Sequence, residues 1–170
     1  MTKSRFPCAA AASEVPIAIV VADQRWRRLP ALAAKIRRAH LTSLPQRLTK
    51  HDVSLLLTDD AELQALNKAW RRKDKPTNVL SFPATRPVPK RTPRLLGDIA
   101  ISYDRVRSEA DHAGINVTDH ALHLFVHGLL HLTGHDHEHD DQALVMERKE
   151  IRILAKLGIA NPYVVKDQDE

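Results

Sequence analysis

The chain is organised around one segment, His127-Gly128-Leu129-Leu130-His131-Leu132-Thr133-Gly134-His135-Asp136-His137. Two histidines four residues apart lie one turn apart on the same face of a helix, so both rings can reach one ion. Gly134 can adopt a positive φ and end the helix, which allows a third imidazole to return to that ion. Three imidazoles with an open fourth position are typical of a catalytic zinc site. The alternative is a histidine-rich surface turn, but the helix–glycine–histidine pattern within an apolar helix favours a metal site.

Spacing alone offers three histidines as the third ligand. His137 has the spacing to return to the ion, while His135 and His139 are rivals for that place. A ligating histidine usually donates its other N–H to a carboxylate or carbonyl, and the candidates are Asp98 and Asp136. Each of these two carboxylates also suits a simple cap or turn. His123, one turn before His127, is either such a neighbour of the site or an ordinary polar residue.

The length and composition set the class of protein. The 170 residues, 43% of them apolar, suit one domain with an ordinary core. We expect a flexible tail over 1–14, a single catalytic domain over 15–160 and a C-terminal tail over 161–170. One cysteine excludes a disulfide framework within the chain and suits a reducing compartment. No apolar run approaches a membrane span of about 20 residues. We therefore expect a cytoplasmic protein with no membrane partner.

The charge is distributed unevenly along the chain. Residues 1–96 carry 19 Lys or Arg and 7 Asp or Glu, whereas residues 97–170 carry 7 and 14, so the two parts have charges of +12 and −7. A basic part beside an acidic, histidine-rich part suggests a polyanion held near a metal site. Ordinary solvated helix faces would also explain this pattern.

Apolar runs and helical spacing predict an α+β fold with a mixed, mostly parallel four-stranded sheet packed with helices. The fourth strand is either antiparallel to the third or at an edge. The helix that carries the metal-binding histidines is apolar around most of its circumference and is expected at the centre, with Thr118 and Asp119 as its cap. The predicted strands are 16–22, 53–58, 79–82 and 95–102, and the other predicted helices are 29–44, 61–70, 103–113 and 141–157.

The motif has the outline of the metzincin zinc proteases, with one decisive difference. The protease mechanism needs a glutamate after the first histidine to take a proton from water, and this chain has Gly128 there. Phosphodiester cleavage remains open, because its transition state spreads negative charge over oxygens that arginine and a cation can hold.

Three blocks of the sequence resemble the YbeY family of zinc-dependent endoribonucleases. They are the histidine segment, Leu66-Asn67 with Trp70-Arg-Arg-Lys-Asp-Lys-Pro-Thr-Asn-Val-Leu-Ser-Phe-Pro83, and Gly97-Asp-Ile-Ala-Ile-Ser102. The resemblance, which extends from about residue 15 to 158, implies a metzincin-like fold. It also implies single-strand-specific RNA cleavage, small-subunit rRNA 3′-end processing and a role in ribosome quality control. The chain departs from the family in His135, where tyrosine is frequent, and in its Pro-rich basic loop 84–94.

The resemblance also implies the roles of individual residues. One Zn²⁺ per chain is bound by His127, His131 and His137, and Arg71 joins His127 and His131 as a catalytic residue. The basic residues that follow Arg71 are expected to contact RNA. The expected partners are ribosomal RNA and the ribosome, with ribosomal proteins or ribosome-associated GTPases as protein partners. Two alternatives are a zinc peptidase or other metallohydrolase of metzincin-like fold, and a non-catalytic RNA-binding protein with a structural zinc. The expected RNA-contacting residues are Arg72, Lys73 and Lys75.

Overall fold

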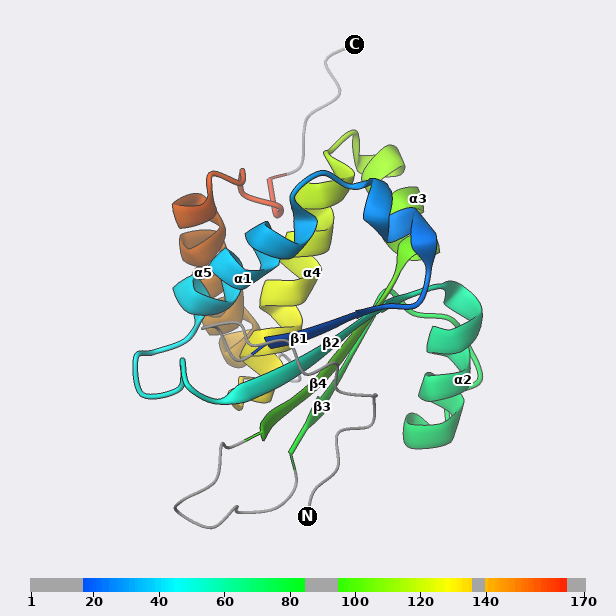
Figure 1. Cartoon of the computed structure of the whole chain (residues 1–170). Coiled ribbons are helices and arrows are strands. Elements are labelled where there is room, and N and C mark those ends of the chain that lie inside the picture. Colours follow the sequence, from blue (N-terminus) through cyan, green and yellow to red (C-terminus); the bar gives the residue numbers. More distant parts are fainter. Residues whose placement is uncertain (1–16, 85–94, 136–139, 165–170) are drawn as a thin grey trace.

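The structure is a computed structural model that describes residues 17–84, 95–135 and 140–164. Figure 1 shows the helices gathered around one twisted sheet. The strands are β1 (Ile17–Val21), β2 (Asp52–Thr58), β3 (Val79–Pro83) and β4 (Leu95–Ser102). A 3₁₀ helix, η1 (Gln24–Arg28), precedes α1 (Leu32–Ser43), and the remaining helices are α2 (Asp60–Arg71), α3 (Tyr103–Ala113), α4 (Val117–Leu132) and α5 (Asp140–Leu157).

The four strands form one mixed sheet in the order β1-β2-β4-β3. β1, β2 and β4 run parallel, whereas β3 runs antiparallel to β4, with Ser81 opposite Ile99. The predicted α+β fold with a mixed, mostly parallel four-stranded sheet is therefore confirmed. Of the two alternatives for the fourth strand, the antiparallel one is correct: β4 lies between β2 and β3, and β1 and β3 are the edge strands.

Helices cover both faces of the sheet (Figure 1). Leu63 of α2 packs with Leu80 and Phe82 of β3 on one face. On the other face α4 contacts β3 and β4, and it also packs against α1, α3 and α5. β2 is apolar along most of its length because both of its faces are buried. The predicted central position of α4 follows from this arrangement, since Phe125 and Leu129 are fully buried.

Two helices begin at positions that differ from the prediction. The cap of α4 is Asn116, whose Oδ1 accepts from the backbone N–H groups of Thr118 (2.8 Å) and Asp119 (3.3 Å). The predicted cap residues therefore lie in the first turn, because the asparagine before them already satisfies the free N–H groups. The first helix of the prediction, 29–44, is shorter: it begins at Leu32 after Ala31, which has a φ of 55°.

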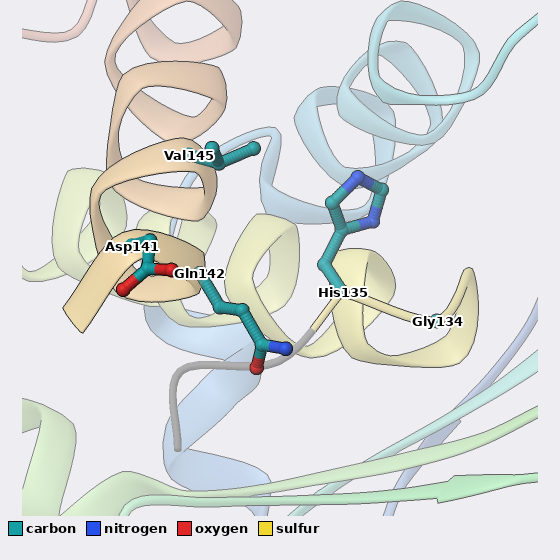
Figure 2. Close-up of a pocket in the computed structure, with 5 residues that line it drawn as sticks. All are labelled: Gly134, His135, Asp141, Gln142 and Val145. Atoms are coloured by element: carbon teal, nitrogen blue, oxygen red, sulfur yellow. The ribbon is translucent and has the colours of Figure 1, made fainter. Parts of the chain in front are cut away.

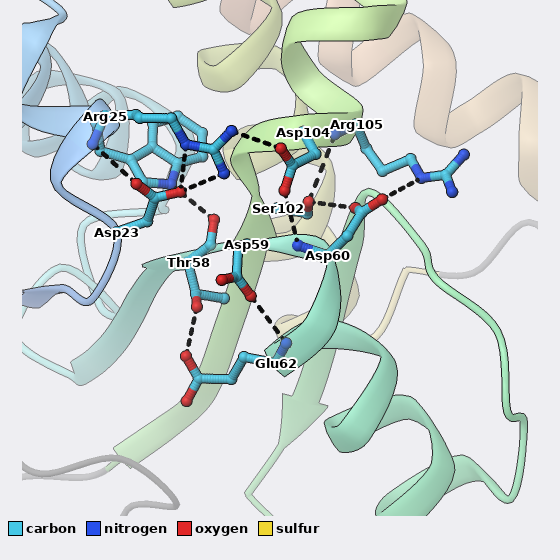
Figure 3. A network of polar contacts seen from close by, with 10 residues as sticks. Asp23, Arg25, Thr58, Asp59, Asp60, Glu62, Ser102, Asp104 and Arg105 are labelled. Atoms are coloured by element: carbon cyan, nitrogen blue, oxygen red, sulfur yellow. Dashed lines mark hydrogen bonds and ion pairs between the residues drawn. The ribbon is translucent and has the colours of Figure 1, made fainter.

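A polar network joins the carboxyl ends of β1, β2 and β4 (Figure 3). Asp104, at the start of α3, accepts from Arg25 Nη1 at 2.6 Å and from the backbone N–H of Asp60 at 3.0 Å. Asp60 in turn accepts from the Ser102 hydroxyl at 2.5 Å. The same residues lie beside the caps of α2 and α3, where Asp59 accepts from the N–H of Glu62 and Ser102 accepts from the N–H of Arg105. No helix in the described ranges has the length and apolar character needed to cross a membrane.

Candidate metal centre

His127 and His131 lie side by side on α4. Their Nε2 atoms are 3.1 Å apart, and their rings stand nearly perpendicular, at 78°. Two nitrogen ligands of a tetrahedral zinc, each at about 2.0–2.1 Å from the ion, lie about 3.3 Å apart. The pair therefore has the separation that a shared metal ion requires.

The opposite nitrogens of both rings face acceptors. His127 Nδ1 is 2.8 Å from Glu150 Oε1, and His131 Nδ1 is 2.9 Å from the backbone carbonyl oxygen of His135. An ionised carboxylate and a carbonyl can only accept, so each Nδ1 carries the proton and donates it. Each Nε2 then presents its lone pair toward the other ring, and a cation between the rings would satisfy both. The donor set fits a metal such as zinc.

The turn after α4 places the carbonyl that His131 contacts. Gly134 has a φ of 89°, as expected for the residue that ends this helix, and its N–H donates to the carbonyl of His131. The next N–H, that of His135, donates to the carbonyl of Leu130 at 3.1 Å. This positive-φ turn closes the helix and directs the His135 carbonyl back toward the His131 ring.

The predicted third ligand, His137, lies outside the described residues, as do its rival His139 and Asp136. The ring of His135, the other rival, has protein partners at both nitrogens. Its Nδ1 lies 3.1 Å from Thr133 Oγ1, and its Nε2 contacts Lys149 Nζ. Within the described ranges no cluster of three or more potential ligands forms, and one of the three predicted histidines lies outside those ranges.

A cavity of about 330 Å³ lies between the turn that follows α4 and the start of α5. Figure 2 shows His135 on one side of it and Gln142 and Val145 on the other. Gly134 and Asp141 complete its lining. The predicted third ligand, His137, lies in the sequence between the residues of these two sides and is outside the described residues.

Glu150 is the site residue that the sequence interpretation missed. It is fully buried on α5, and it accepts hydrogen bonds from His127, from His123 (3.2 Å) and from the Tyr163 hydroxyl. Burial alone would raise the pKa of this carboxyl, but the three hydrogen bonds outweigh burial and lower the pKa to about 2. A signal was present in the sequence, because Glu150 interrupts an apolar stripe of α5 that includes Met146 and Leu154.

Asp98, a candidate partner of the metal ligands, lies on the other side of the sheet. Its neighbour Ile99 faces α4, where its Cγ2 lies close to Gly128. Successive strand residues point to opposite faces, so Asp98 points to the face that α2 covers. It is also paired in register with Phe82, which packs in that layer.

Arg71 reaches the edge strand that α4 also contacts. It is the last residue of α2, and its Nη2 donates to the backbone carbonyl of Ser81 at 3.1 Å. On the α4 side, a Cβ atom added to Gly128 would come within 2.9 Å of Ser81 Oγ. Ser81 is therefore flanked by Arg71 and by the helix turn that carries His127, which brings these predicted site residues to one strand.

The predicted RNA-contacting residues lie where α2 ends. Arg72 closes the helix with a φ of 58°, and Lys73 and Lys75 follow in the loop to β3. All three side chains are exposed. The loop is held by Asn67 Nδ2, which donates to the carbonyl of Lys75 at 2.8 Å. The arrangement presents three cations next to Arg71.

Comparison with known proteins identifies the family. The sequence model described as "Endoribonuclease YbeY" matches residues 21–158. An Endoribonuclease YbeY of Bradyrhizobium diazoefficiens is 49% identical over 152 residues, which cover 85% of this chain and 82% of that protein. The chain belongs to the YbeY endoribonuclease family. Another member, from Erythrobacter litoralis, is 47% identical over 148 residues, which cover 83% of this chain and 91% of that protein.

A solved structure supports the fold of this YbeY family member. The solution structure of a Thermotoga maritima protein aligns with a TM-score of 0.58 and 23% identity, covering 91% of this chain and 99% of that one. The YbeY match at residues 21–158 includes Arg71, His127, His131 and Glu150, whereas Tyr163 lies beyond it.

Proposed function

We propose that this chain is a single-strand-specific, zinc-dependent endoribonuclease of ribosomal RNA maturation. Family membership supports cleavage of RNA. The observation that carries the metal dependence is the His127–His131 pair, whose Nε2 atoms are 3.1 Å apart while each Nδ1 faces an acceptor. The proposed biological role is small-subunit rRNA 3′-end processing and ribosome quality control in the cytoplasm.

In this proposal His127, His131 and His137 hold one zinc ion. A zinc ion bound there would lower the pKa of water and stabilise negative charge on phosphoryl oxygens. The hydrogen bonds from each Nδ1 fix the orientation of the two rings of α4 and leave each Nε2 to face the ion. Arg71 would hold the phosphoryl oxygens from across β3, since its planar guanidinium can donate to two oxygens at once.

Gly128 argues against the peptidase alternative on structural grounds. A Cβ at this position would lie 2.9 Å from Ser81 Oγ and 3.1 Å from Ile99 Cγ2. The helix therefore packs against β3 and β4 at the place where a metalloprotease carries its general base. A side chain that could take a proton fits there only if the Ser81 and Ile99 side chains move aside.

The direct test compares three substrates. Protein purified without a metal-affinity column is incubated with a single-stranded RNA, with the same RNA in a duplex, and with casein, each with and without a chelator. We expect cleavage of the single-stranded RNA only, and its loss with the chelator. Cleavage of casein would support the peptidase, whereas binding of RNA without cleavage would support the RNA-binding protein with a structural zinc.

A further inference from the structure

We propose that Glu150, held by Tyr163, positions the metal-binding ring of His127. In this role Glu150 does not bind the metal: it fixes which nitrogen of His127 is protonated and where the ring points. The inference rests on the proposed metal site. It adds two residues, one from α5 and one from the segment after it, to the group of side chains on which metal affinity depends.

Three donors surround the Glu150 carboxylate. Its Oε1 accepts from His127 Nδ1 at 2.8 Å, and its Oε2 accepts from His123 Nε2 at 3.2 Å and from the Tyr163 hydroxyl. The carboxylate is fully buried, so these donors replace the water that it would otherwise bind. A carboxylate fixed in this way holds the His127 ring in one orientation.

The two metal histidines depend on different kinds of acceptor. His131 donates to a backbone carbonyl, which no side-chain substitution removes. His127 donates to Glu150, so its orientation depends on a single side chain from another helix. The negative charge behind His127 also raises the basicity of its Nε2, which strengthens binding of a divalent cation.

Tyr163 connects the end of the described chain to this arrangement. The segment after α5 returns toward α4, and the Tyr163 ring meets the His123 ring edge-on, with the centroids 5.7 Å apart. Burial and the adjacent carboxylate raise the pKa of Tyr163 above its usual range, so its hydroxyl stays protonated and donates to Glu150. We expected residues 161–170 to form a tail, yet Tyr163 within that stretch contacts the buried carboxylate.

The first experiment measures zinc affinity by competition with a chelator. Glu150→Gln should weaken zinc binding by about 10- to 100-fold, as is usual when the partner of a metal ligand is changed. Tyr163→Phe keeps the ring and the carboxylate but removes one donor, so its loss should be smaller, about 3- to 10-fold.

Glu109→Gln is the matched control. Glu109 accepts from His120 Nε2 at 2.7 Å, which makes it a second carboxylate partner of an α4 histidine, but one away from the metal pair. This control should bind zinc like the wild type. The inference is overturned if Glu150→Gln and Tyr163→Phe both bind zinc as tightly as the wild type, or if Glu109→Gln loses as much affinity as Glu150→Gln.

The second experiment does not depend on whether the variants fold. Nitrogen-15 NMR of the metal-free wild type at neutral pH should show His127 protonated at Nδ1 and unprotonated at Nε2. The opposite tautomer would overturn the inference. These outcomes differ from failure of the proposed function, in which the wild type itself would bind no zinc.

Discussion

Arg71 illustrates how much one side chain can contribute without contacting the histidines. Its guanidinium donates to the Ser81 carbonyl of the edge strand, on whose other side α4 packs. A guanidinium has five N–H donors in a fixed plane, so an arginine anchored to β3 can still present donors to a phosphate. A lysine ammonium retains the charge but lacks this planar geometry.

The first prediction follows for Arg71→Lys. We expect RNA affinity to stay close to that of the wild type, while the turnover rate falls about tenfold or more, because the lost interaction belongs to the transition state. Single-turnover cleavage and direct binding measure the two effects separately.

Lys73→Gln and Lys75→Gln are the controls for Arg71→Lys. Each should weaken RNA binding modestly and reduce the salt dependence by about one counterion. Wild-type turnover in Arg71→Lys would reduce Arg71 to one more member of the basic surface.

His40 allows a second prediction at the residue scale. It is fully buried in α1, and burial lowers its pKa to about 4 despite partial compensation by the backbone of Thr49. In the unfolded chain the pKa of histidine is about 6.5. Because the unfolded chain takes up a proton at His40 more readily than the folded one, the free energy of unfolding falls as the pH drops from about 6.5 toward 4. Above pH about 6.5 His40 is neutral in both states and has no effect on the pH dependence.

The expected size of the His40 effect is about 2 kcal/mol of unfolding free energy lost between pH 7.5 and pH 5. Urea unfolding of metal-free protein at both pH values measures it. His40→Gln should lose less stability over this interval than the wild type, while the exposed control His112→Gln should behave like the wild type. An unchanged pH dependence in His40→Gln would contradict the interpretation.

At the scale of elements, the packing of α4 on the sheet produces a prediction with an unusual sign. Alanine normally stabilises a helix interior by about 1 kcal/mol relative to glycine. At Gly128, however, the new methyl group would meet Ser81 Oγ, which can rotate away, and Ile99 Cγ2, which cannot easily move. We expect Gly128→Ala to lower the free energy of unfolding by about 1 kcal/mol in urea titration. A more stable variant would show that the helix does not press against β4 as described.

The same elements show what the sequence could and could not predict. Apolar runs located all four strands, and the mostly apolar sequence of β2 indicated burial on both faces. The place of β4 between β2 and β3 was not predictable, because strand order depends on contacts between distant segments. The sequence predicted Thr118 and Asp119 as the cap of α4, but the cap is Asn116. All three residue types suit a cap, so the sequence did not distinguish among them.

For the site, spacing within one helix was predictable from the sequence, whereas contacts between two helices were not. A four-residue spacing on a helix places two rings on one face, and the Nε2 atoms of His127 and His131 are accordingly neighbours. The partner of His127 comes from α5, and no spacing within the histidine segment indicates it. His137 as the third ligand stays a prediction, because it lies outside the described residues.

At the scale of the whole molecule, the fold separates two polar regions. The carboxyl ends of the parallel strands hold a capping network of acidic and basic side chains (Figure 3). The histidine pair lies instead on the part of α4 that packs against β3 and β4, beside the strand that Arg71 contacts. Apolar contacts with the sheet and the neighbouring helices hold α4 in place, and these contacts do not require a metal. We therefore expect the fold to persist when the metal is removed.

The central claim is that a metal held by α4 is required for RNA cleavage. The most direct measurement returns zinc stepwise to chelator-stripped protein and records cleavage of a single-stranded RNA together with bound zinc. We predict that stripped protein is folded but inactive, and that the cleavage rate rises in proportion to bound zinc until each chain holds one ion. His131→Ala should remain inactive throughout. Cleavage at the full rate by stripped protein would contradict the account.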